Sequence, residues 1–292
     1  MSLPGNFDIM AACPTVFNND QTINYEETAQ IPRFLERIGI HSIAVLLFGG
    51  EYYRLSLSEK GEIIDLIRHS SNWKGKLIVG INDNSLNAMI ELSRLAKKSD
   101  ADAVVVSPPA YVPFYRYGRK FVESFLRKLL EKVDQPVIFQ DTELPEDHLP
   151  SLKFWKNYVQ SNVLYGFKIE GRNSLKKIRT IRKTYQDAKI YGGYLGINIP
   201  KEIKAGSNGS IIGSAIPDIV IKSMFYQNFS MWDTLTRFLK FEVHHMSEFV
   251  EIEKYLLMKR GVITRYTSRD PSPHLSWRLI DELDRFYLEF GL

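Results

Sequence analysis

The sequence predicts an α/β fold in which eight parallel strands close into a (β/α)8 TIM barrel with a C-terminal helical extension. Three observations support this prediction. Short apolar runs rich in β-branched residues alternate with longer amphipathic patterns along the chain. The short runs are continuously apolar, which is typical of strands buried on both faces of a parallel sheet. About eight such units fit into 292 residues, and a barrel of this class typically needs roughly 250 residues.

The first half of the chain supplies four of these units. An apolar run at 9–17 precedes a helical pattern over 25–38, with Gly39 as its stop. The second run, 43–48, is followed by Ser56 and Glu59, whose spacing is that of a capping box at the start of a helix. The third and fourth strands are expected at 77–80 and 103–107, followed by helical patterns around 88–96 and 121–133.

The second half supplies the remaining strands and the extension. Strands are expected at 136–139, 163–168, 188–191 and 210–212. The strand rhythm then stops, and two helical patterns remain, at 232–259 and 275–289. Since no Gly/Ser-rich or Pro-rich linker precedes them, we expect residues 1–225 to form the barrel and residues 226–292 to pack on it.

An open, doubly wound sheet is the alternative architecture. Such a sheet normally carries a Gly-x-Gly-x-x-Gly turn after its first strand, where it binds a dinucleotide. The corresponding segment here, 13–17, contains no glycine. The sequence therefore favours the barrel.

Composition excludes several classes of partner and site. The net charge is only +4, and basic residues alternate with acidic ones, so we expect no nucleic-acid or membrane partner. A single cysteine, Cys13, precludes an intramolecular disulfide and is typical of a reducing compartment. With no apolar run near the roughly 20 residues of a membrane span, we expect a cytoplasmic protein. Adjacent His244 and His245 point apart on a helix, so we expect no metal and no other cofactor.

Lys168 is the candidate reactive group. It lies near the end of the apolar run that starts at Val163 and breaks at Gly171. Burying an ammonium group is costly unless it is paired or its pKa falls, and a fallen pKa makes the amine a nucleophile. The alternative is that the run ends earlier and the lysine extends into solvent. Because barrel active sites form at the C-terminal ends of the strands, we interpret Lys168 as the reactive centre.

Residues at the other strand ends are expected to surround the same mouth. Backbone amides freed by glycines can hold a carboxylate, although a glycine pair taken alone is more often a simple turn. We therefore expect a substrate-binding set made of Phe48, Gly49, Gly50, Phe139, Gly192 and Ile211.

The chain resembles the dihydrodipicolinate synthase and N-acetylneuraminate lyase superfamily of Schiff-base-forming barrel enzymes. The resemblance rests on the order and spacing of four segments, 47–51, 107–111, 136–139 and 166–170. It implies that Lys168 condenses with the ketone of a 2-oxo acid and that the turn at Gly49 and Gly50 receives the carboxylate. It also implies a homotetramer or a homodimer.

Several positions depart from the family pattern. Phe139 is matched to the family's proton-relaying tyrosine, and Phe48 and Gly49 are matched to two threonines of the carboxylate-binding turn. Leu144 falls near the arginine that holds the aldehyde substrate in dihydrodipicolinate synthases. These departures disfavour a condensation of pyruvate with an aldehyde. Segments 137–141 and 167–170 look more like those of 2-keto-3-deoxy sugar-acid dehydratases.

The expected function is therefore that of a lyase which dehydrates or cleaves a 2-keto-3-deoxy sugar acid. A synthase-like condensation with pyruvate and a catalytically silent 2-oxo-acid-binding barrel are the alternatives. Residues two apart in a strand share a face, so Glu170 can carry protons beside Lys168, unless it is a solvated loop residue. Tyr111 is the best of the other proton carriers, ahead of Tyr52 and Tyr53.

Overall fold

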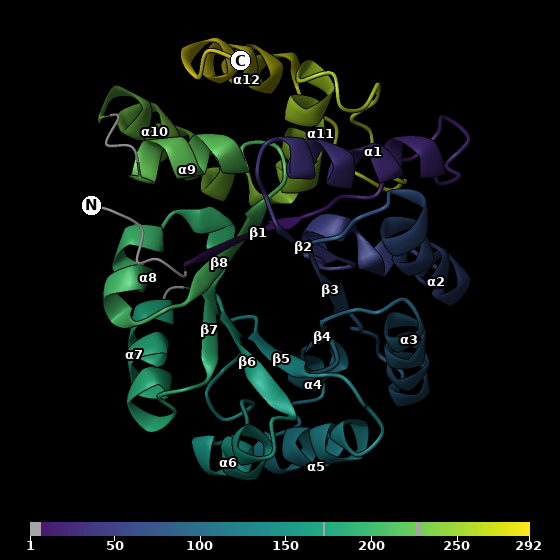
Figure 1. Ribbon diagram of the computed structural model, residues 1–292, viewed down its shortest axis with the longest axis vertical. Helices are drawn as coiled ribbons and strands as arrows, with labels where there is room; N and C mark the ends of the chain where they lie inside the picture. The colour runs from purple at the N-terminus through teal and green to yellow at the C-terminus, as the bar shows by residue number, and fades with distance from the viewer. Residues whose placement is uncertain (1–6, 172, 226–228) are drawn as a thin grey trace.

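The computed structural model describes residues 7–171, 173–225 and 229–292, and its central feature is a closed barrel of eight parallel strands (Figure 1). The strands follow one another around the barrel in sequence order, and the last pairs with the first. The predicted fold class is thus confirmed, and the open sheet is excluded. The strands are β1 (Asp8–Ala12), β2 (Ser42–Val45), β3 (Lys76–Gly80), β4 (Ala103–Val106), β5 (Val137–Asp141), β6 (Leu164–Ile169), β7 (Lys189–Gly192) and β8 (Gly209–Gly213).

Helices surround the barrel and cover its outer face (Figure 1). Polar side chains cap several of them: the side chains of Asn24, Ser56, Ser85 and Ser151 each accept a hydrogen bond from a backbone amide of the first turn. The capping box of Ser56 is confirmed. The outer helices are α1 (Tyr25–Arg37), α2 (Leu57–Asp65), α3 (Leu86–Lys98), α5 (Arg119–Leu130), α6 (Leu152–Gln160), α7 (Ser174–Thr184), α8 (Ile199–Ala205) and α9 (Pro217–Phe225), and the short α4 (Tyr111–Phe114) lies in the connection between β4 and α5.

Alternate strand residues fill two separate apolar layers. One layer lies inside the barrel and contains Met10, Ile78, Ile138 and Tyr191 among others. The larger layer lies between the sheet and the helices. Because the side chains of a strand alternate, this division fixes which residues can reach the barrel mouth.

The C-terminal part differs from the prediction in one respect. We expected one helix over 232–259, but the structure has α10 (Phe229–His244), a short 3-10 turn η5 (Met246–Glu248) and α11 (Phe249–Lys259). His245, with φ −106° and ψ 41°, leaves the helical conformation and breaks the helix. The expected boundary at 225/226 adjoins residues outside the described part of the chain.

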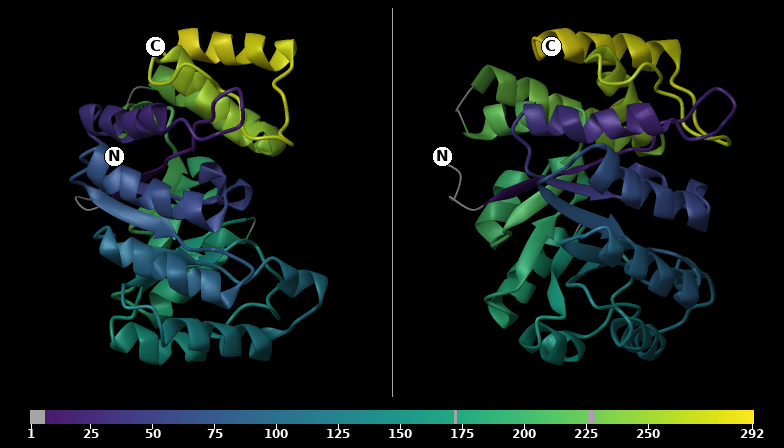
Figure 2. Two further views of the ribbon diagram at one scale, coloured as in Figure 1. Left: turned by 90° about the vertical axis from the view of Figure 1, so that its right-hand side faces the viewer. Right: turned by 45° about the vertical axis from the view of Figure 1, so that its right-hand side comes forward.

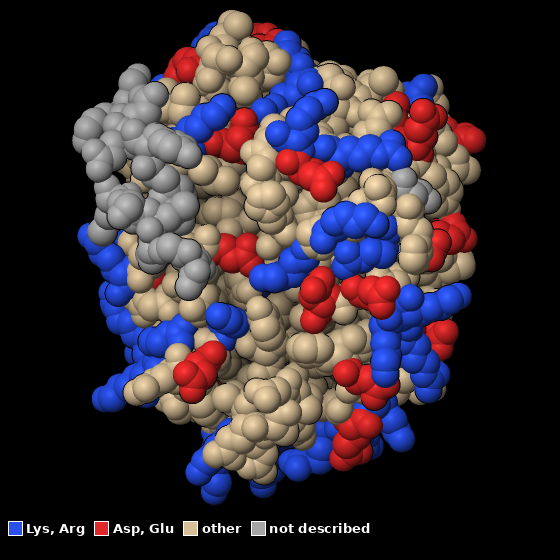
Figure 3. Space-filling view, in the orientation of Figure 1, with Lys and Arg blue, Asp and Glu red and all other residues tan. Residues whose placement is uncertain are grey.

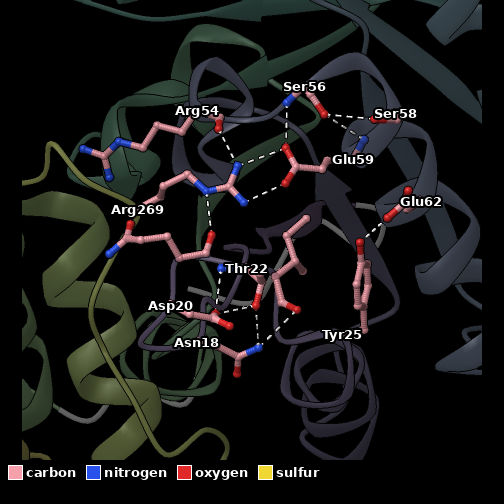
Figure 4. Close-up of polar contacts among 12 residues, drawn as sticks. Asn18, Asp20, Thr22, Tyr25, Arg54, Ser56, Ser58, Glu59, Glu62 and Arg269 are labelled. Carbon is pink, nitrogen blue, oxygen red and sulfur yellow. Dashed lines mark hydrogen bonds and ion pairs between the residues drawn. The ribbon is translucent and has the colours of Figure 1, made fainter.

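α11 and the last helix, α12 (Trp277–Glu289), lie against the barrel on the side of α1, with α12 outermost (Figure 2). Lys254 of α11 forms an ion pair with Glu51, and neither side chain is exposed to solvent. Arg269, in the loop before α12, donates to both carboxylate oxygens of Glu59 at 2.6 and 2.9 Å and to the backbone oxygens of Gln21 and Arg54 (Figure 4). The C-terminal segment is therefore fastened to the loops after β1 and β2.

Charged side chains are interspersed over most of the face seen in Figure 3, and basic side chains gather along its left edge over α7 and α8. Among the described helices, none combines the length and apolarity needed to cross a lipid bilayer.

Candidate active site

A cavity of about 440 Å³ opens at the C-terminal ends of the strands. Its walls come from the ends of β1, β6 and β8, from the segments after β2, β5 and β7, and from the first turn of α11. The expected residues Phe48, Gly49, Lys168, Glu170 and Ile211 all line it. The break between α10 and α11 matters here because it brings Met246, Phe249 and Val250 to the same cavity.

Lys168 reaches this cavity from inside the barrel. Its backbone pairs with Gln140 of β5 on one side and with Tyr191 of β7 on the other, near the end of β6. The residue is only 5% exposed, and its amine forms an ion pair with the Glu170 carboxylate. The amine is thus largely shielded from water and has a proton acceptor in direct contact.

Glu170 lies one residue beyond the strand but continues its pairing. Its backbone amide donates to the oxygen of Asp141 at 3.2 Å, which keeps the alternation of β6 intact for one more residue. The side chain therefore points to the same side as Lys168. The Gln140 amide donates to the second oxygen of Glu170 at 3.1 Å, so the carboxylate bridges Gln140 and Lys168.

The turn after β2 forms the opposite wall. Phe48–Gly50 is a 3-10 turn, η1, whose first hydrogen bond is donated by Gly50 to the oxygen of Leu47. The backbone amides that precede Gly50 in the turn donate no hydrogen bond within it, so a bound anion can accept from them. A Cβ built on Gly49 would lie 3.3 Å from Cε1 of Phe249, so the ring from α11 lies close to the space that a side chain at this position would take.

Tyr53 and Arg54 complete the polar part of this wall. Arg54 donates to Glu51 at 2.7 Å, and its guanidinium lies 5.3 Å from the centroid of the Tyr53 ring. Burial raises the pKa of the Tyr53 phenol, so this side chain stays a neutral hydrogen-bond donor at physiological pH.

Glu202 of α8 is a functional candidate that the sequence analysis missed. Its side chain is fully buried against Gly192 at the end of β7, and neither carboxylate oxygen has a hydrogen-bond partner among the described residues. Burial, together with the charge of Glu170, raises the pKa of this carboxyl to about 8. The sequence did carry a signal for Glu202: a Gly-Gly pair at a strand end is followed by a glutamate inside an apolar helical pattern.

Four expected site residues, Phe139, Tyr111, Gly50 and Gly192, are not among the residues that line this cavity. Phe139 faces the outer layer, where its ring centroid lies 4.8 Å from that of Trp155, because the alternation of β5 turns Ile138 and Gln140 inward instead. The ring of Tyr111 packs on two other aromatic rings and does not line the cavity. Gly50 packs against the backbone oxygen of Cys13, and Gly192 packs against the side chain of Glu202.

A second cavity of about 490 Å³ lies outside the barrel, between α6 and α7, and contains Phe139. Of its two lysines, Lys176 and Lys177, the second is paired with Asp141 at 2.6 Å. Within the described residues, no cluster of three or more histidine, cysteine or acidic side chains is arranged to hold a metal ion. The main cavity itself presents the Lys168 amine beside the Glu170 carboxylate.

Comparisons with known proteins agree with this geometry. Residues 6–232 match the family model described as the dihydrodipicolinate synthetase family. An uncharacterized DapA-like lyase from Pyrococcus horikoshii is 29% identical over 212 residues, which are 70% of this chain and 71% of that protein. A 4-hydroxy-tetrahydrodipicolinate synthase from Methanosphaera stadtmanae is 29% identical over 218 residues, 70% of each chain. A crystal structure of dihydrodipicolinate synthase from Rhodopseudomonas palustris has the same fold, with a TM-score of 0.85 at 22% identity over 99% of both chains.

Proposed function

Because the chain belongs to the dihydrodipicolinate synthetase family, we propose that it is a lyase that forms a Schiff base between Lys168 and a 2-oxo acid. The substrate we propose is a 2-keto-3-deoxy sugar acid, and the reaction is its dehydration or its aldol cleavage. The observation that carries this proposal is the buried amine of Lys168, held at the cavity in contact with the Glu170 carboxylate.

The first step is imine formation. Glu170 takes a proton from the Lys168 ammonium, and the free amine attacks the ketone carbon of the substrate. Glu170 returns this proton to the former ketone oxygen, which leaves as water, so that a protonated imine and the Glu170 carboxylate result. The carboxylate of the substrate lies at the turn of Phe48 and Gly49, where backbone amides precede the first hydrogen bond of the turn.

The protonated imine then acts as an electron sink for the neighbouring carbon. In dehydration, a base removes a proton from C3, and the C4 hydroxyl leaves with a proton as water. In aldol cleavage, a base takes the proton of the C4 hydroxyl, the C3–C4 bond breaks, and an aldehyde leaves. We assign the base to Glu170 in both cases. The hydroxyls of Tyr53, Thr142 and Ser247 at the cavity support a polyhydroxylated substrate.

Borohydride trapping tests the central step. The protein is incubated with pyruvate or with a 2-keto-3-deoxy sugar acid, reduced and analysed by peptide mass spectrometry. We expect the reduced adduct on Lys168 and none in Lys168→Met. Lys177→Met is the matched control, because this lysine is also paired with an acidic side chain but lies at the second cavity. Absence of any adduct would mean a silent barrel.

Product analysis then separates the reactions. Loss of water with all carbons retained identifies a dehydratase, and release of pyruvate identifies an aldolase. A condensed product from pyruvate and an aldehyde, without cleavage or dehydration of any sugar acid, identifies the synthase-like alternative.

A homotetramer or a homodimer is part of the same proposal. The aromatic side chains of Phe114 and Tyr115 are 80% and 62% exposed at α4, and exposed aromatic groups of this kind favour a contact between subunits. Light scattering on the purified chain tests it, and a monomeric mass at micromolar concentration would contradict it.

A further inference from the structure

Glu202 is placed in a way that ordinary packing does not explain. It comes from the outer helix α8, its side chain is 0% exposed, and both of its oxygens lack partners among the described residues. An ionised carboxylate in such a place is strongly unfavourable, whereas the neutral acid is tolerated. Glu202 is therefore a neutral acid in the folded protein at neutral pH.

Two consecutive glycines make room for two carboxyl groups. A Cβ on Gly192 would lie 1.8 Å from Oε2 of Glu202, and a Cβ on Gly193 would lie 2.5 Å from Cγ of Glu170. Any side chain at either position would displace one of the glutamates. The end of β7 thus brings the buried acid close to the carboxylate that contacts Lys168.

We propose that Glu202 is a positioning residue for the Lys168–Glu170 pair, standing as a neutral acid beside Glu170 so that this carboxylate alone balances the amine. The inference rests on the proposed Schiff-base function. While Glu202 is neutral, the pair carries no net charge, and Glu170 can accept the proton that Lys168 must lose. Once Glu202 ionises, a second negative charge holds the ammonium form of Lys168 more firmly, and imine formation slows.

Among the residues that the structure describes, the other charged groups around α8 leave Glu170 as the group that acts on Glu202. On α8 itself, Lys201 and Lys204 are exposed. From α7, Arg182 is bound to the oxygen of Gly206 at the far end of α8. From β7, Tyr191 belongs to the apolar layer inside the barrel. Burial and the Glu170 charge are the causes that raise the pKa of Glu202 to about 8.

The test is the pH dependence of imine formation. The rate of borohydride-trapped adduct formation on Lys168 is measured between pH 6 and 10 in the wild type and in Glu202→Gln, which keeps the shape and removes the ionisation. Since Glu202 has a pKa near 8, the wild-type rate normalised to pH 7 should fall below that of the variant as pH rises through this value, and the ratio of the two rates should level off once Glu202 is fully ionised. Glu242→Gln is the control, because Glu242 is also buried but adjoins Glu253, away from the cavity.

The possible outcomes separate the two proposals. No adduct in the wild type overturns the function itself. An adduct with the same pH profile in the wild type and Glu202→Gln overturns the role of Glu202 alone. If Glu202→Gln does not fold, infrared spectroscopy of Glu242→Gln decides, because the buried Glu242 carboxyl would otherwise contribute to the same band: a protonated-carboxyl band that is lost with a midpoint near pH 8 supports the inference, and a spectrum unchanged between pH 6 and 10 refutes it.

Discussion

Replacing Lys254 by methionine should strongly destabilise the protein, because it breaks an ion pair with no solvent access. Lys254 and Glu51 are both 0% exposed, and the amine also donates to the hydroxyl of Ser268 at 3.2 Å. Methionine has a similar length and keeps the apolar part of the packing. It leaves the Glu51 carboxylate buried with Arg54 as its remaining partner at 2.7 Å.

The expected loss is about 3 kcal/mol of unfolding free energy, at the lower end of the range for breaking a buried ion pair, since Arg54 still compensates part of the Glu51 charge. The double variant Glu51→Gln/Lys254→Met should recover part of this loss, because it removes that charge. Lys259→Met on the same helix is the control: Lys259 is one-third exposed and pairs with Asp284 at 3.0 Å, and a pair of this kind contributes at most about 1 kcal/mol.

Urea unfolding followed by circular dichroism measures these differences. If Lys254→Met loses no more stability than Lys259→Met, the reasoning about the buried pair is wrong. Because α11 also carries Phe249 and Val250 to the cavity, the same variant should raise KM for the substrate. An unchanged KM would show that the pair does not position this wall.

Three further predictions concern other parts of the molecule. Arg269→Ala, which removes two bonds to Glu59 and two to backbone oxygens, should cost about 2–3 kcal/mol in urea unfolding; a loss below 0.5 kcal/mol on this scale would contradict it. Phe139→Tyr should leave kcat/KM unchanged because its ring packs on Trp155 outside the barrel, and a gain in turnover would return this position to the site. Glu202→Gln should flatten the dependence of stability on pH. The folded pKa of about 8 lies above the ordinary 4.5, so the native state holds the extra proton between these values and stability falls as pH rises through them. By pH 7 this loss is on the order of 3 kcal/mol; unfolding free energies from urea curves that change by the same amount between pH 5 and 8 in both proteins would refute it.

Much of the candidate site follows from local patterns. A continuously apolar run with one lysine and a glutamate two residues later was enough to place Lys168 and Glu170 on one face, and the structure brings them into contact. The same period of two assigns Phe139 and Gln140 to opposite faces, but the sequence does not say which of them faces inward. The pairing of Gln140 with Lys168 across β5 and β6 decides it.

The sequence by itself determined the barrel, because continuous apolar runs that recur along the chain indicate strands buried on both faces. Only the tertiary structure decided which residues that are distant in the sequence contact one another around the barrel, and where its buried charges lie. The pair of Glu51 and Lys254 joins positions 203 residues apart, and Glu202 meets Gly192 through the packing of α8 on the end of β7. Such contacts depend on the three-dimensional path of the chain, which no local periodicity encodes, and they set the burial and charge on which the proposed chemistry depends.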